Sequence, residues 1–236
     1  MVTPDLLTII VPVYNEAATV RAVIERLLAI DLPVPREIIV VDDGSTDGTR
    51  AVLADVIRDG MRVTVLSAER NGGKGSAIRR GLEHATGTVV AIQDADLELD
   101  PEQLRVLIAP ILDRRTQVVY GSRFLNGPSG APWLTVAANR ALTVVTNLLY
   151  ASALTDMETC YKIMRTDVAR SLALTANGFD IEPEITARLL RRGHQIRELP
   201  IRFEARSRSQ GKKIRWRDGV RALVVLATER FRHEGS

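Results

Sequence analysis

Two carboxylates near the middle of the chain have the type and spacing of metal ligands. The apolar run 89–93 ends at Asp94-Ala95-Asp96, and Glu98 follows. Side chains at positions i and i+2 of an extended segment point to the same side, so Asp94 and Asp96 can share one hard cation such as Mg²⁺ or Mn²⁺. Such a cation would neutralise the charge on a diphosphate leaving group. We predict a metal site there, with Glu98 as a third ligand or a solvated loop residue; the competing interpretation is a solvated turn.

A second acidic pair, Asp42 and Asp43, ends another apolar run. The segment 42–49 resembles the start of a calcium loop, but Ala54 stands where that loop needs its glutamate, which excludes a calcium loop. A turn that caps the next helix explains Asp47 but not two adjacent carboxylates. We expect Asp43 to accept hydrogen bonds from a nucleobase or a ribose hydroxyl.

The glycine-rich segment 71–76, NGGKGS, precedes a helical pattern. It fits neither the P-loop pattern nor the dinucleotide-binding pattern. Glycines and a lysine at a helix N-terminus suit an anion, whereas the alternative is a helix entry that needs unusual backbone dihedrals. We predict that Lys74 contacts either a phosphate or the core of the loop.

Short apolar runs alternate with runs of helical period along the chain. The expected strands are Thr8–Val13, Glu37–Val41, Val63–Ser67, Val89–Gln93, Val118–Gly121 and Ile196–Phe203. The expected helices are Glu16–Ile30, Gly48–Arg58, Gly75–Ala85, Pro101–Arg114, Leu134–Leu154, Glu182–Arg192 and Arg217–Phe231. This alternation predicts an α/β fold with a mostly parallel sheet and helices on both faces, the first four strands being buried on both sides. Ligands of such sheets bind at the carboxyl ends of the strands, where segments 12–16, 42–45 and 94–96 meet.

Charge is unevenly distributed. Residues 188–236 contain 14 Lys/Arg and 5 Asp/Glu, a net charge of +9, whereas the first 187 residues carry −6. This asymmetry indicates an anionic partner for the C-terminal part. The run 202–217 has few interleaved aromatic residues, which disfavours nucleic acid and leaves a diphosphate, membrane headgroups or a solvated charge run.

Cysteine content and hydropathy indicate the compartment. Cys160 is the single cysteine, which suits a reducing environment. We expect no signal peptide, because no basic segment precedes the first apolar run. We also expect no membrane span, because the longest mainly apolar stretch, Trp133–Leu154, contains Arg140 and several polar residues. The expected location is the cytoplasm, at the cytoplasmic face of a membrane.

Six segments occur in an order that resembles a known enzyme family. They are TIIVPVYNE, IIVVDDGSTDGT, NGGKGSAIRRG, QDADLELDP, YGSRF and TDMETCYK. Together they resemble family 2 glycosyltransferases of the GT-A fold, and within them the dolichyl- or polyprenyl-phosphate mannosyl- and glucosyltransferases. The resemblance spans roughly residues 6–215. It implies a Rossmann-like GT-A domain over residues 1–215, followed by a basic amphipathic helix over 216–236.

The resemblance also implies roles on the donor side. A nucleotide-sugar would be held by Pro12, Tyr14, Glu16, Val41, Asp43, Lys74, Asp94 and Ala95. Asp94 and Asp96, with Glu98, would hold the divalent metal on its diphosphate, which makes Asp96 a catalytic candidate. Arg206 and Lys212 match a basic loop that closes over the donor, although Arg208 and Lys213 fit nearly as well.

Roles on the acceptor side follow from the same resemblance. Arg123 would contact a donor or acceptor phosphate, Asp156 would lie near the acceptor, and Lys162 matches a basic position there. Many relatives continue into transmembrane helices. Membrane contact of this chain is expected instead through Leu134–Leu154 and the helix from Arg217, or through a membrane partner protein.

The chemistry of the acceptor separates the remaining alternatives. A sugar hydroxyl needs a general base, whereas a phosphate monoester is largely a dianion at pH 7 and needs only cations to position it. Acids on the expected acceptor side are few, namely Asp156, Glu158, Glu182 and Glu184. This favours a phosphate acceptor; for a hydroxyl acceptor, Asp156 is the first candidate base.

The sequence therefore predicts a metal-dependent inverting glycosyltransferase that moves glucose or mannose from a UDP- or GDP-sugar to a polyprenyl phosphate. The alternative is a family 2 enzyme with a soluble phosphorylated or glycan acceptor. A sugar-phosphate nucleotidyltransferase ranks lower, because its glycine-rich loop normally follows the first strand, where this chain has Tyr14-Asn15-Glu16. A non-enzymatic sugar- or nucleic-acid-binding module is disfavoured by Asp94 and Asp96.

Overall fold

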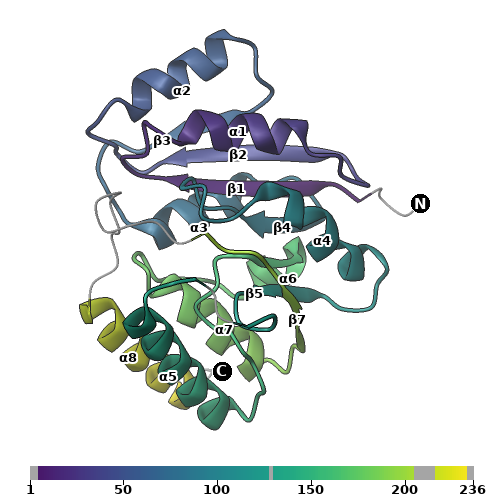
Figure 1. The fold of residues 1–236 in the computed structure, drawn as a ribbon, viewed down its shortest axis with the longest axis vertical. Helices are drawn as coiled ribbons and strands as arrows, with labels where there is room; N and C mark the ends of the chain where they lie inside the picture. The colour runs from purple at the N-terminus through teal and green to yellow at the C-terminus, as the bar shows by residue number, and fades with distance from the viewer. Residues whose placement is uncertain (1–4, 128–129, 205–215, 233–236) are drawn as a thin grey trace.

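A computed structural model of the chain describes residues 5–127, 130–204 and 216–232. In these ranges seven strands form one sheet in the order β3-β2-β1-β4-β6-β5-β7 (Figure 1). Every neighbouring pair is parallel except the two pairs made by β6, which is antiparallel to β4 and to β5. The strands are β1 (Leu7–Val13), β2 (Arg36–Asp42), β3 (Thr64–Ser67), β4 (Val89–Ile92), β5 (Val118–Ser122), β6 (Lys162–Arg165) and β7 (Ile196–Pro200). The predicted mostly parallel sheet is confirmed.

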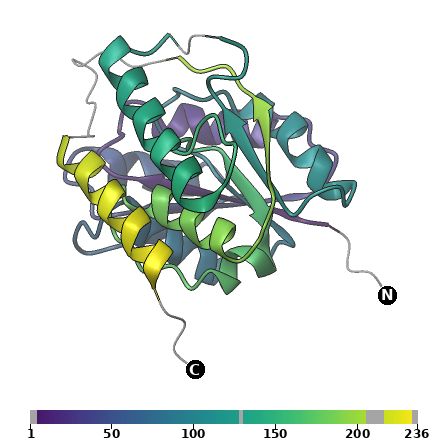
Figure 2. The ribbon, with the colours of Figure 1, turned by 90° about the horizontal axis from the view of Figure 1, so that it is seen from below.

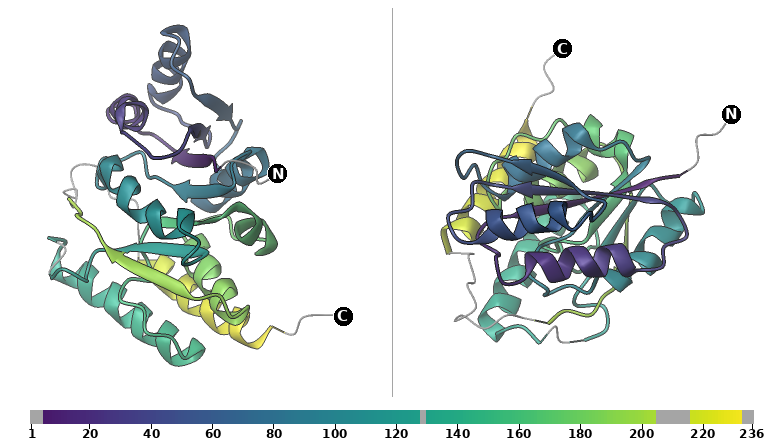
Figure 3. Two further views of the ribbon diagram at one scale, coloured as in Figure 1. Left: turned by 90° about the vertical axis from the view of Figure 1, so that its right-hand side faces the viewer. Right: turned by 90° about the horizontal axis from the view of Figure 1, so that it is seen from above.

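Helices cover both faces of the sheet. On one face α1 contacts α2 and the short 3-10 helix η1 that leads into α4, while on the other α3 packs on β1 and β2 and contacts α6. Figure 3 shows these layers from two further sides. The helices are α1 (Val20–Ala29), α2 (Thr49–Arg58), α3 (Lys74–His84), η1 (Pro101–Gln103), α4 (Leu104–Leu112), α5 (Trp133–Tyr150), α6 (Thr166–Ser171), α7 (Ile181–Arg191) and α8 (Trp216–Phe231).

The central strand β1 explains where a ligand can enter. It pairs with β2 along its whole length, but with β4 only from Leu7 to Ile10. Pro12 lies beyond the end of β4, so its missing N–H removes no bond from that side of the sheet. The chains leaving β1 and β4 therefore separate, and this is the topological switch point at which open α/β sheets bind ligands.

One expectation about the sheet was wrong, and two short elements were missed. β3 is an edge strand whose ends, Thr64 and Ser67, are exposed, so it is not buried on both faces as β1, β2 and β4 are. The strand β6 and the helix α6 were not predicted. Both are short, and β6 begins and ends with a basic residue, which hides its apolar pattern.

The helices α5, α7 and α8 pack against one another and lie side by side in the view from below (Figure 2). The Tyr150 hydroxyl of α5 donates to the Leu226 carbonyl of α8 at 2.8 Å. Arg188 of α7 pairs with Glu229 of α8 at 2.8 Å, with both side chains buried. None of the helices in the described ranges is long and apolar enough to cross a membrane.

Candidate active site

The end of β2 is tied to the glycine-rich segment 71–76. Both carboxylate oxygens of Asp43 accept backbone hydrogen bonds, from Gly72 N at 2.9 Å and from Gly73 N at 2.6 Å. Asp43 is only 4% exposed, and this burial raises the pKa of its carboxyl. Gly73 has φ +97°, and a Cβ there would lie 2.4 Å from the Asn177 carbonyl oxygen. The glycines thus serve close packing and a left-handed backbone.

The main chain at the start of α3 hydrogen-bonds within the protein. Gly75 N donates to the Gly178 carbonyl at 3.2 Å, and Ser76 N donates to the Asn177 carbonyl at 3.1 Å. These amides are the ones that would point at an anion bound to the helix N-terminus. The observed contacts favour the second alternative for segment 71–76, a helix entry with unusual dihedrals.

Lys74, the first residue of α3, links two acidic side chains. Its Nζ lies 2.8 Å from Asp94 Oδ1 at the end of β4 and 3.0 Å from Glu182 Oε1 in the first turn of α7. Burial opposes the charge of Lys74, yet the nearby carboxylates hold its pKa well above the usual value. The pKa of Asp94 is lowered because the attraction of Lys74 outweighs its burial. Both side chains are therefore charged near neutral pH.

Lys162 extends this row of charges. It is fully buried at the start of β6, and its Nζ lies 2.7 Å from Glu182 Oε2. The same ammonium donates to the carbonyls of Met157 at 2.9 Å and Thr159 at 2.5 Å, and it lies 4.8 Å from the centre of the Tyr120 ring. A continuous chain of alternating charges thus runs through Asp94, Lys74, Glu182 and Lys162 and is called here the buried charge chain. Glu182 and Lys162 are buried, whereas Lys74 and Asp94 are partly exposed.

The turn after Asp94 presents the second predicted metal ligand. Asp96 Oδ1 accepts a hydrogen bond from the backbone N–H of Glu98 at 3.1 Å, and Leu97 between them has φ 63°. Among the residues that the structure describes, no three His, Cys, Asp or Glu side chains are close enough to form a metal site by themselves. The structure therefore does not bring Asp94, Asp96 and Glu98 together as a three-carboxylate site, and Glu98 as a ligand stays a prediction.

The carboxylates of Asp94 and Asp96 nevertheless fit a metal ion that binds together with a diphosphate. Mg²⁺ in nucleotide sites is commonly held by one or two carboxylates, with substrate phosphates and water as the remaining ligands. Asp94 and Asp96 provide two carboxylates at the end of β4, and the Asp94 side chain is 27% exposed. A hard cation with oxygen ligands suits this donor set.

Arg123 and Asp156 form a bidentate pair on the other side of β4. Arg123 Nε and Nη2 each lie 2.7 Å from an oxygen of Asp156, whose side chain is fully buried. The guanidinium also lies 5.6 Å from the centre of the Phe124 ring and 5.3 Å from that of Phe203. Glu198 of β7 accepts from the backbone N–H of Asp156 at 2.9 Å. Asp156 thus holds Arg123 in place and has no exposed oxygen for an acceptor.

The other predicted donor-side residues cluster at the ends of β1, β2 and β4. Pro12 and Val41 are paired across β1 and β2, and Ala95 is 3% exposed beside Asp94. Tyr14 and Glu16 follow β1, and Glu16 N donates to Thr49 Oγ1 at 2.9 Å. Arg206 and Lys212 lie outside the described residues, as do Arg208 and Lys213.

The sequence places Glu158 among the acids of the acceptor side but indicates no role for it. Its Oε1 is buried and has no hydrogen-bond partner, although the residue as a whole is partly exposed. Burial raises the pKa of its carboxyl to about 7; Glu182 and Asp156 add to the rise, while Lys162 and Arg123 oppose it. An unsatisfied buried carboxylate is uncommon in a native protein and calls for an explanation.

Glu182 was also given no role. Its position in the first turn of a helix is explained by the helix dipole, so the sequence offers no sign that it bridges two lysines. The spacing of Lys74 and Lys162, on different elements, likewise gives no indication of a shared partner.

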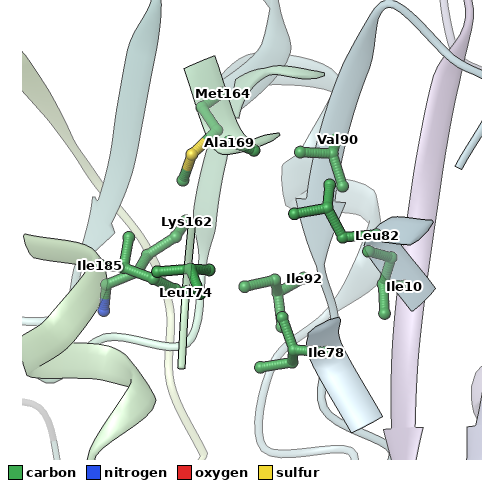
Figure 4. Close-up of a pocket in the computed structure, with 10 residues that line it drawn as sticks. All are labelled: Ile10, Ile78, Leu82, Val90, Ile92, Lys162, Met164, Ala169, Leu174 and Ile185. Carbon is green, nitrogen blue, oxygen red and sulfur yellow. The ribbon is translucent and has the colours of Figure 1, made fainter. Parts of the chain in front are cut away.

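An apolar hollow lies in the core between α3, β4 and β6 (Figure 4). Its walls include Ile78 and Leu82 on one side, and Met164 and Ile185 on the other. Lys162 is the one charged residue among the ten that line it, and Figure 4 shows its nitrogen turned away from the aliphatic wall opposite. Such a hollow offers almost no polar partner to a sugar, which leaves the strand ends as the candidate donor site.

Comparison with known proteins identifies the family of the chain. A family model described as "Glycosyl transferase family 2" matches residues 8–172, from β1 to the end of α6. "Glycosyltransferase AglJ" of Haloferax volcanii is 29% identical over 234 residues, which cover 98% of this chain and 73% of that protein. "Polyprenol monophosphomannose synthase" of Mycolicibacterium smegmatis is 28% identical over 220 residues, which cover 88% of this chain and 82% of that protein.

A solved structure shares the fold. The crystal structure of glucosyl-3-phosphoglycerate synthase from Mycobacterium tuberculosis, in complex with Mn²⁺, UDP and phosphoglyceric acid, superposes with a TM-score of 0.75 at 20% identity. The match covers 98% of this chain and 80% of that one. The predicted GT-A fold is confirmed.

The raised pKa of Glu158 gives a prediction for stability. The pKa of its carboxyl is about 7 in the folded protein and 4.5 as the usual value, so the folded state binds the proton more tightly. Stability should therefore fall as the pH rises through this window. We expect Glu158→Gln to raise the free energy of unfolding at pH 8 by on the order of 3 kcal/mol, and at pH 5 by about 1 kcal/mol or less.

Urea unfolding at the two pH values measures this difference. The matched control is Glu83→Gln, since Glu83 is exposed near the C-terminal end of α3. The control should unfold like the wild type at both pH values. An equal effect of Glu158→Gln at pH 5 and pH 8 would contradict the raised pKa.

Proposed function

The chain belongs to glycosyl transferase family 2 and is a glycosyltransferase, and on that premise we propose that it transfers glucose or mannose from a UDP- or GDP-sugar to a polyprenyl phosphate. In this proposal the anomeric carbon is inverted, and Mg²⁺ or Mn²⁺ is bound during the reaction. The relatives support the acceptor class, since one of them is named a polyprenol monophosphomannose synthase.

The Arg123–Asp156 pair carries the proposal for the acceptor. A sugar hydroxyl would need a general base within hydrogen-bond reach, but both oxygens of Asp156 are bound by Arg123 and the side chain is buried. A phosphate monoester needs no base, because it is already largely a dianion at neutral pH. Arg123, which Asp156 and two aromatic rings hold in place, would position that dianion by charge.

The donor would bind at the ends of β1, β2 and β4. We assign the nucleoside to Pro12, Tyr14, Glu16, Val41 and Asp43, with Ala95 beside them. Asp43 retains lone pairs for a base or ribose group beyond the two amides that it already binds. Arg206 and Lys212 are proposed to lie over the bound donor.

The metal would be held by Asp94 and Asp96, with Glu98 as the proposed third ligand. When bound, a divalent cation stabilises the negative charge that develops on the leaving diphosphate. Lys74 keeps Asp94 ionised and fixed in direction through the 2.8 Å ion pair. The protein thus contributes orientation and charge, while the nucleophile is the acceptor phosphate oxygen.

A surface over α5 and α8 suits a membrane that carries the acceptor. Apolar side chains that are 42–79% exposed lie on both helices, namely Trp133, Leu134, Val144 and Leu148 on α5 and Val220, Leu223, Val224 and Phe231 on α8. Exposed arginines flank them at positions 140, 221, 230 and 232. Apolar groups bordered by arginines are typical of peripheral binding to anionic bilayers.

The reaction is tested by the release of nucleoside diphosphate in the presence of Mn²⁺. UDP-glucose and GDP-mannose are each assayed with and without a short polyprenyl phosphate. We expect release from one donor that requires both the metal and the lipid phosphate. Metal-dependent release that ignores the lipid would move the acceptor to a soluble phosphorylated compound or a glycan, and turnover of neither donor would count against both proposed donors.

Asp96→Ala should reduce the release of nucleoside diphosphate at least about a hundredfold, because it removes a proposed metal ligand. The thermal unfolding temperature should stay within a few degrees of the wild type, because Asp96 lies on a partly exposed turn. Asp31→Ala is the control, because the side chain of Asp31 is 87% exposed after α1. Full activity of Asp96→Ala in chelator-treated buffer would rule out metal binding at this residue.

Membrane binding is tested by co-sedimentation with vesicles that contain anionic phospholipid. Replacing Leu148 of α5 and Leu223 of α8 together by Glu should weaken binding about tenfold or more, because each change puts a charge on the apolar surface. Val106→Glu is the control, since Val106 is 64% exposed on α4. Equal losses for the double variant and the control would contradict docking through α5 and α8.

A further inference from the structure

We propose that Glu158 recognises the sugar being transferred, by accepting hydrogen bonds from its hydroxyl groups. This inference rests on the proposed function and adds to it a residue that distinguishes one sugar from another. It starts from a single observation: Glu158 Oε1 is buried at the candidate site without any hydrogen-bond donor.

The position of Glu158 is between the two halves of the site. It lies in the segment that joins α5 to β6, two residues after Asp156, which binds Arg123. Two residues further on, Cys160 lies against the Asp94 carboxylate. Along the chain, Glu158 therefore lies between Asp156, which binds the proposed acceptor cation, and Cys160, which contacts a proposed metal ligand. In the proposed reaction, the group in transfer would move between these two places.

The cations near Glu158 are already engaged by other acceptors. Arg123 directs Nε and Nη2 at Asp156. Lys162 directs its ammonium at Glu182 and at two carbonyl oxygens. The electrostatic influence of both cations reaches Glu158, but neither donates a hydrogen bond to Oε1. Oε1 of Glu158 thus receives no hydrogen bond from the described part of the protein.

The chemistry of the substrates identifies the donor group. A diphosphate and a phosphate dianion present only acceptor oxygens, which a carboxylate repels. The nucleoside has donors, but its proposed residues are at the ends of β1 and β2, on the other side of β4. The remaining part of the substrates is the hexose, whose hydroxyl groups donate. A carboxylate that accepts from such hydroxyls makes charge-assisted hydrogen bonds, which are stronger than neutral ones.

The cost of an unpartnered carboxylate supports a role in binding. Burial raises the pKa of Glu158, and no hydrogen-bond donor among the described residues offsets this burial at Oε1. A neutral side chain would be better tolerated at this place in the free protein. Sugar hydroxyls would offset that penalty only in the complex, which is the behaviour of a binding residue and not of a residue that supports the fold.

Isothermal titration calorimetry with Mn²⁺ tests the proposal. The ligands are UDP, GDP, UDP-glucose and GDP-mannose, and the proteins are the wild type, Glu158→Gln and the control Glu83→Gln. For the nucleotide that the wild type binds, we expect Glu158→Gln to leave the Kd of the diphosphate within about twofold and to weaken the nucleotide-sugar about tenfold, as for the loss of a charged hydrogen bond. Glu83→Gln should change neither Kd.

Analogues of the bound nucleotide-sugar that each lack one hydroxyl sharpen the test. For one analogue, the Kd for the wild type should be about tenfold higher than that of the parent compound. Glu158→Gln should bind this analogue and the parent compound with equal Kd, because the variant already lacks the carboxylate that accepts from the missing hydroxyl. Equal weakening of diphosphate and nucleotide-sugar by Glu158→Gln would overturn the proposal and assign Glu158 a structural role. A large loss of kcat with unchanged binding of the sugar would overturn it in favour of a general base. If the wild type binds none of the four ligands, the proposed donors themselves fail.

Discussion

A largely buried chain of alternating charges holds the two sides of the candidate site together. Three consecutive ion pairs of 2.8, 3.0 and 2.7 Å link Asp94, Lys74, Glu182 and Lys162 in this order. These residues come from the end of β4, the start of α3, the start of α7 and the start of β6. Removing charges from water costs several kcal/mol for each ion, so the arrangement persists because each charge faces an opposite one. The positions of the four segments are therefore interdependent.

This constraint shapes the neighbouring site. The start of α3 is fixed by Lys74 on one side and by the two amides that Asp43 binds on the other, so the end of β2 and the end of β4 are held at a defined separation. Arg123 and Asp156 form a separate pair at the end of β5. In the proposed reaction the donor diphosphate and the acceptor phosphate occupy these two places, and the hexose lies between them near Glu158.

Much of the fold follows from local sequence pattern. The strands β1, β2 and β4 are continuous apolar runs with β-branched residues, and acidic residues at their ends indicate a site because parallel strands end at a shared edge. The six quoted segments then identify the family. The strand β6 was not predicted because it begins with Lys162, which is charged and yet fully buried. Hydrophobicity scales do not anticipate a fully buried lysine. The partners of Lys74 and Glu182, and the isolation of Glu158 Oε1, depend on contacts between elements distant in sequence.

The interdependence of the buried charge chain is measured most directly by a double-mutant cycle at its centre. The free energies of unfolding at pH 7 are determined by urea titration for the wild type, Lys74→Met, Glu182→Gln and the double variant. We expect each single change to be strongly destabilising and the double variant to be less destabilised than their sum, with a coupling of at least about 1.5 kcal/mol. Additive effects within about 0.5 kcal/mol would show that these residues act independently, and would contradict a chain of charges that positions Asp94.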